Sequence, residues 1–184
     1  MTRRRYLFDT PERFVAGTIG EPGNRTFFLQ ARDGSRIVSV MLEKVQVAAL
    51  AQRLDELLDE LDRRGIEGAS DDAHLTGDAG PLDEPINEAF RAGTLSLGWD
   101  TADDLVLVEA REQVEDEEAE DEPDDDDEDG PDLLRVRMTA LAAREFVAGA
   151  VRVLASGRPP CPLCGQPLDP QGHLCPRRNG HLLN

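Results

Sequence analysis

Three cysteines near the C-terminus carry the chemistry that the sequence predicts most clearly. Cys161 and Cys164 are separated by two residues within Cys-Pro-x-Cys-Gly, and Cys175 follows further along the chain. Two residues between the thiols allow the backbone to turn so that both sulfurs point at one metal ion. An odd number of cysteines, in a chain without an export signal, favours metal ligation over disulfide bonding. The spacing therefore predicts a small zinc ribbon.

A histidine is expected to complete this zinc site. The stretch Asp-Pro-Gln-Gly at 169–172 is typical of a turn, so the chain should return towards the first two cysteines as a hairpin. His173 and Cys175 are two residues apart on the returning strand and therefore share one face of it. His181 is the alternative fourth ligand. A ligand set with histidine favours zinc, because a mononuclear iron site more typically has four thiolates.

Two alternatives to a closed zinc site remain open from the residues alone. In the first, three reduced cysteines lie in a disordered tail that holds no metal. In the second, three thiolates and a water molecule hold the metal, which leaves an open position that could be catalytic. Only Asp169 and the histidines are near enough in sequence to act as a general base there.

The tail resembles that of an uncharacterised actinobacterial family, a domain of unknown function of about this length. The resemblance rests on Cys-Pro-x-Cys-Gly, then Pro-Leu-Asp-Pro-x-Gly-His-x-Cys-Pro-Arg, then Asn179-Gly180. The N-terminal stretch Phe8-Asp9 with Phe14-Val15-Ala16-Gly17 is also similar, so most of the chain is covered. The arginine-rich, lysine-poor composition fits a GC-rich genome. The resemblance implies a zinc site and no catalytic activity.

The strands and helices that precede this tail can be predicted from an internal repeat in the sequence. The matched segments are 14–19 with 90–95, 28–32 with 107–111, 38–42 with 134–138, and 50–58 with 146–154. The third pair alternates in the manner of strands, the last follows a helix, and each half reads as strand, strand, strand, helix. The sequence therefore predicts an α+β fold: duplicated β-β-β-α units form a mainly antiparallel sheet with two helices, and the zinc ribbon follows. One continuous sheet and a closed, barrel-like sheet both fit this pattern.

The same matches predict the domain organisation. A duplicated domain is expected over residues 1–158 and the zinc-ribbon tail over 159–184. The parts of the duplicated domain are repeat one at about 6–65, a linker at about 66–86, repeat two at about 87–157, and an acidic loop inserted at about 113–131. The offset between matched segments grows from the second pair to the third, which places the insertion between the second and third strands of repeat two.

Both helices are predicted from apolar spacing and end signals. In the first, from Lys44 to Arg64, apolar residues at 47, 50, 54, 57, 58 and 61 form one stripe, and Gly65 is suited to the C-terminal cap. The second should begin after Thr139, a good N-cap. Its expected inward positions are 143, 146, 147, 150, 151 and 154.

The charge of the chain restricts its partners. Net charge is −18, and the run from 115 to 129 is almost entirely Asp and Glu. Such a field repels nucleic acid and anionic lipid, so direct nucleic-acid binding by the whole chain is disfavoured. The tail is basic, with Arg158, Arg177 and Arg178, and nucleic-acid contact is possible there alone. The chain lacks an apolar stretch of membrane-spanning length and a secretory signal, so we expect a soluble, cytoplasmic protein that does not bind membranes.

Two functions of different classes fit the sequence. The first is a non-catalytic zinc-binding interaction or regulatory protein whose partner is a protein, with a basic surface or nucleic-acid machinery as candidates. The second is an enzyme with an anion-binding pocket between the two repeats and a structural zinc ribbon. Its repeated polar residues, Arg32, Arg111, Thr18 and Thr94, would then converge in space. No catalytic motif is present: the chain has no phosphate-binding glycine loop and no nucleophile elbow.

Overall fold

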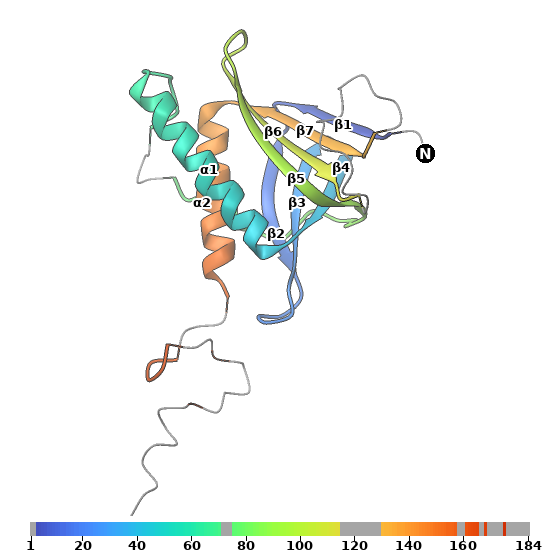
Figure 1. Cartoon of the computed structure of the whole chain (residues 1–184), viewed down its shortest axis with the longest axis vertical. Helices are drawn as coiled ribbons and strands as arrows, with labels where there is room; N and C mark the ends of the chain where they lie inside the picture. Colours follow the sequence, from blue (N-terminus) through green and yellow to red (C-terminus); the bar gives the residue numbers. More distant parts are fainter. Residues whose placement is uncertain are drawn as a thin grey trace, which may run out of the picture.

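The computed structural model describes residues 3–70, 75–114, 130–157, 161–165, 168 and 175. Two helices and seven strands lie in these ranges (Figure 1). In chain order they are β1 (Arg5–Asp9), β2 (Arg13–Ile19), β3 (Thr26–Asp33), β4 (Arg36–Leu42), α1 (Lys44–Arg63), β5 (Glu88–Asp100), β6 (Leu105–Glu112), β7 (Leu133–Met138) and α2 (Ala140–Ala155). The predicted α+β class is therefore confirmed.

All seven strands form one mixed sheet in the order β1-β7-β6-β5-β4-β3-β2. The pairs β1–β7 and β4–β5 are parallel, and the other four neighbouring pairs are antiparallel. Strand-strand-strand-helix is the order from β2 to α1 and again from β5 to α2, as the sequence predicts. Strand β1 precedes both. The acidic run lies outside the described residues, in the connection from β6 to β7.

The two edge strands of this sheet follow one another in the chain. The backbone N–H of Thr10 still donates to the Arg137 carbonyl of β7 at 2.8 Å, and Arg13 already lies opposite Arg32 of β3. Within three residues the chain thus passes from one sheet edge to the other. The sheet is continuous, and it must curl because this short bend joins its two edges.

Both helices cover the inner face and pack against each other (Figure 1). Helix α2 contacts β2 and β6, and α1 contacts β5. The core is aliphatic with a few phenylalanines: Phe14 stacks on Phe146 with ring centroids 4.8 Å apart. The buried residues of α1 are Val47, Leu50, Ala51, Leu54, Leu58 and Leu61. Leu57, the remaining predicted position, is partly buried against the same core.

Both helices are capped as the sequence predicts, but one residue of α2 that was predicted to face the core is exposed. The Thr139 side chain accepts from the Ala142 N–H at 3.2 Å, and Gly65 has a φ of 78°, which suits the end of α1. Val151 is 53% exposed, so its predicted inward position is wrong. The buried stripe continues instead through Val153, and Leu154 is partly buried against the same core.

The predicted linker contains a strap, residues 75–86, that passes α2 and continues on the outer face of β2–β4. Leu82 packs there on Val15 and Phe28 in a small cluster separate from the main core. Gly17 makes room for it, because a Cβ at that position would lie 2.4 Å from a Leu82 methyl carbon. The buried Gln30 amide both donates to the Asp83 carbonyl and accepts from the Asp83 N–H. The strap is therefore part of the packed body.

Candidate functional site

The three cysteines predicted as metal ligands lie together. Their sulfur atoms are all within 4.8 Å of one another, and the sulfurs of Cys161 and Cys175 are 3.9 Å apart. Cys161 and Cys175 are buried, and Cys164 is half-buried. The turn between the first two cysteines is closed by the Gly165 N–H, which donates to the Cys161 carbonyl at 2.8 Å. Gly165 has a φ of 74°, a conformation that favours glycine.

This arrangement fits a metal ion and does not fit a disulfide. Tetrahedral zinc with Zn–S bonds of about 2.3 Å holds its sulfurs about 3.8 Å apart, close to the separation of Cys161 and Cys175. A disulfide would need about 2.05 Å. The backbone N–H groups of Cys164 and Leu163 point at the Cys161 sulfur and lower the pKa of that thiol. A lowered thiol pKa favours the thiolate that a metal requires. Three close cysteines could therefore bind a metal ion.

The two candidate fourth ligands lie outside the described residues. These are His173 and His181, together with the expected turn at 169–172. Their assignment stays a prediction from sequence spacing.

The four repeated polar residues of the enzyme hypothesis do not converge. Thr94 and Arg111 are opposite each other on β5 and β6. Thr18 lies opposite Phe27, whose side chain belongs to the main core, so Thr18 faces inwards. Arg32 is on the outer face and binds Glu12 at 2.6 Å and Asp83 at 3.2 Å. These positions therefore do not form one pocket.

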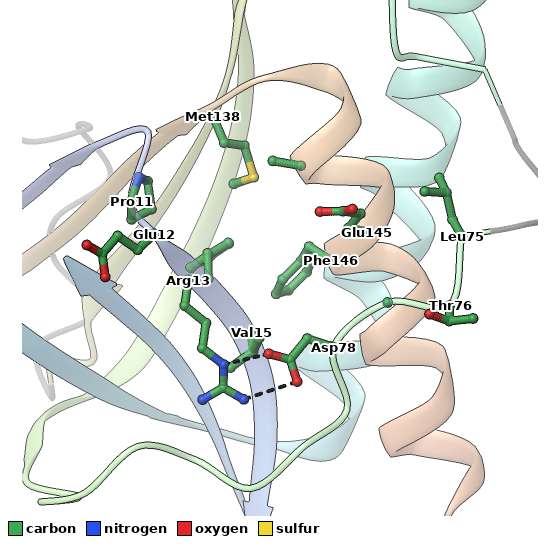
Figure 2. A pocket seen from close by; sticks show the side chains of 13 residues that line it. Pro11, Glu12, Arg13, Val15, Leu75, Thr76, Asp78, Met138, Glu145 and Phe146 are labelled. Atoms are coloured by element: carbon green, nitrogen blue, oxygen red, sulfur yellow. Dashed lines mark hydrogen bonds and ion pairs between the residues drawn. The ribbon is translucent and has the colours of Figure 1, made fainter. Parts of the chain in front are cut away.

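A cavity of about 400 Å³ does lie between the two halves of the body. Figure 2 shows it between the start of β2, the first residues of the strap and α2. Phe14, Phe146 and Met138 supply apolar walls, and Glu12, Asp78 and Glu145 supply carboxylates.

The cation of this cavity, Arg13, is already neutralised. It donates to Asp78 at 2.6 and 3.1 Å and to Asp83 at 2.7 Å. The guanidinium holds the pKa of both carboxyl groups below its usual range. Because carboxylates outnumber cations here, the cavity disfavours an anionic ligand. Sequence reasoning missed this cluster, since nothing local connects Arg13 with acidic residues of a distant linker.

The fold and the cysteines define an α+β protein with a curled mixed sheet and a three-cysteine cluster that could hold a metal ion. A family model described as protein of unknown function (DUF3090) matches residues 6–175. The chain belongs to this family, as the resemblance to an uncharacterised family implied.

Comparisons with curated proteins and with solved structures gave no match. Among the residues that the structure describes, neither α1 nor α2 is apolar enough along its length to cross a membrane.

Proposed function

We propose that the protein is a non-catalytic zinc-binding interaction or regulatory protein, with one zinc ion bound by the thiolates of Cys161, Cys164 and Cys175. The observation that carries this proposal is the clustering of the three sulfurs within 4.8 Å. Three soft thiolates favour zinc over magnesium or calcium, which prefer oxygen ligands. A segment of this size has too few apolar residues for its own core, so metal binding would supply its folding energy.

His173 is the proposed fourth ligand, and His181 is the alternative. Two considerations favour His173. Its spacing from Cys175 places both on one face of an extended strand. The stretch that matches the family model ends at residue 175, so it includes His173 and leaves out His181. Four protein ligands would close the site, and a closed site is typical of structural rather than catalytic zinc.

An acidic run, residues 115–129, is the proposed contact for a partner protein with a basic surface. Thirteen of its fifteen residues are Asp or Glu. Such a run attracts a cationic surface over several ångströms and speeds its association. The enzyme alternative receives less support, because its polar residues are dispersed and the cavity between the halves carries excess carboxylate.

Metal content per chain tests the zinc proposal. Purified wild-type protein should contain about one zinc, because the four ligands form a single tetrahedral site. Cys161→Ser and Cys175→Ser should lose it, since serine is a poor zinc ligand. His173→Ala should weaken zinc retention against a chelator, whereas His181→Ala, the matched control, should leave it unchanged.

Other outcomes would redirect the proposal. Wild-type protein without zinc, prepared without chelators, would refute it. Weakening by His181→Ala alone would make His181 the ligand. Zinc that is insensitive to both histidine changes would indicate a water-completed, open site, and the enzyme hypothesis would then be preferred.

The partner proposal predicts salt-sensitive binding of a labelled deca-arginine peptide, measured by fluorescence anisotropy. Exchanging every Asp and Glu of 115–129 for Asn and Gln should remove most of the binding, because the attraction is electrostatic. A variant with the same residues in shuffled order should bind like the wild type. Undiminished binding by the neutralised variant would show that another surface attracts the peptide.

A further inference from the structure

A second cavity, of about 240 Å³, lies at the end of the body from which the tail departs. It is lined by Gly23, Arg25, Phe27, Lys44, Leu154 and Gly157. These residues come from the β2–β3 hairpin, the first turn of α1, and the last turn of α2 with the residues just after it, which lie in the lower part of the body in Figure 1. Three segments far apart in sequence thus form one concave surface.

The lining of this cavity is positively charged although the chain as a whole is acidic. Its two charged residues, Arg25 and Lys44, are both cations, and no carboxylate lines it. Neither forms an ion pair with any residue that the structure describes, whereas Arg4, Arg13, Arg32, Arg137 and Arg144 all bind aspartates. Lys44 is exposed and Arg25 is half-buried, so the cavity presents two positive charges in a chain whose net charge is −18.

The guanidinium of Arg25 is held in place and incompletely satisfied. Its Nη1 donates to the Ser156 hydroxyl at 2.9 Å, and that hydroxyl donates to the Val153 carbonyl at 2.7 Å. Its Nε is buried, and no described residue accepts its N–H. A buried N–H group without an acceptor is costly unless a ligand or water molecule occupies the space beside it.

Attraction to the C-terminal end of α2 is the simpler explanation for these cations. However, in the described residues no hydrogen bond joins Lys44 or Arg25 to a carbonyl of α2. The Arg152 and Val153 carbonyls already accept from the N–H and the hydroxyl of Ser156. The helix end therefore does not satisfy the Nε of Arg25.

We propose that this cavity binds a phosphate group. Two positive charges match a phosphate dianion better than a carboxylate monoanion, and Arg and Lys together are common phosphate ligands. Phe27 and Leu154 add apolar surface beside the two cations, which suits the organic part of a phosphate monoester. The cavity is separate from the cysteine cluster and from the acidic cavity between the halves, so this site does not depend on the proposed zinc function.

Lys44 offers a direct test, because it is the only lysine of the chain. Full-length protein, as purified and labelled with ¹³C-lysine, should show one lysine Cε signal. Sodium phosphate, added at constant ionic strength and above the second pKa of phosphate, should shift this signal saturably. Arg25→Gln should weaken the apparent affinity about tenfold or more, the usual effect of losing a charge-assisted hydrogen bond. The matched control is Arg53→Gln, at an exposed arginine of α1.

Each alternative outcome contradicts the phosphate site. A linear shift, equal for phosphate, acetate and chloride, would indicate bulk screening only. Saturation by acetate with the same affinity as phosphate would indicate a carboxylate site. Equal weakening by Arg25→Gln and Arg53→Gln would show that Arg25 does not belong to the site.

Ser156→Ala should weaken phosphate binding less than Arg25→Gln does, while the circular dichroism spectrum stays unchanged. This comparison separates an effect on binding from an effect on folding.

The same titration identifies the source of the phosphate. Tighter binding of phenyl phosphate than of inorganic phosphate would support an organic monoester whose apolar part contacts Phe27 and Leu154. Equal affinities would support a site for free phosphate.

Discussion

Replacing Gly149 by alanine is expected to destabilise the protein by about 1–3 kcal/mol, the usual effect of overfilling a packed site. In an ordinary helix the same change would stabilise by about 0.8–1 kcal/mol. The sign should invert here because a Cβ on Gly149 would lie 2.3 Å from the backbone oxygen of Asp78 in the strap. Urea denaturation followed by circular dichroism measures the free energy of unfolding.

The strap has little freedom to move away from the added methyl group. Gly77 has a φ of 62°, and a Cβ there would lie 2.1 Å from the Gly149 nitrogen. Asp78 is held from the other side by Arg13 at 2.6 Å. Gly98→Ala is a suitable control, because a Cβ at Gly98 meets no atom closer than 3.6 Å. A gain of stability in Gly149→Ala would show that the strap does not pack on α2.

Replacing Arg144 by alanine is the second change with a large expected effect, about 1–3 kcal/mol of lost stability, because a buried side chain with three hydrogen bonds is removed while the carboxylates that it binds stay half exposed to water. The side chain is 4% exposed and lies between the helices. Its Nε donates to the Ala69 carbonyl at 2.6 Å, and its two terminal nitrogens donate to Asp55 at 2.5 Å and Asp59 at 2.6 Å. Alanine would leave the Ala69 carbonyl without this donor and the two carboxylates of α1 without their counter-charge.

A double-mutant cycle measured by urea denaturation separates the ion pair from packing. Asp55→Asn should cost much less in the Arg144→Ala background than in the wild type, because the guanidinium it binds is then gone. Arg144→Lys should recover only part of the stability, since an ammonium group cannot reproduce the planar fork. The exposed Arg53→Ala serves as a control. Equal costs of Asp55→Asn in both backgrounds would contradict a coupled pair.

Local features of the chain were predictable because each depends on a few neighbouring residues. The apolar stripe of α1, the Thr139 cap and Gly65 at the helix end follow from backbone geometry within one or two turns. The order of strands and helices from β2 to α2 follows from alternation and repeated segments. The clustering of Cys161, Cys164 and Cys175 was predictable for the same reason, since two of the three share one turn.

The face of the sheet on which each side chain lies depended on long-range contacts, which no local sequence pattern predicts. Thr18 and Thr94 occupy matching places in the repeated segments, yet Thr18 faces the core and Thr94 lies beside Arg111. The register shift between Ala92 and Thr94 causes this difference, because one extra residue moves the following side chains to the other face of a strand. A shared sequence pattern therefore did not imply a shared environment.

By itself, the sequence determined the types and order of the elements from β2 to α2, the helix ends at Thr139 and Gly65, and the clustering of three cysteines that could bind a metal ion. Only the tertiary structure decided that β1 and β2 join the two sheet edges, that residues 75–86 pack as a strap, and that Arg25 and Lys44 line one cavity. The physical reason is the distance along the chain over which each interaction acts. Periodicity and capping report interactions along the chain, whereas sheet closure and cavities arise from residues that meet only after the whole chain has folded.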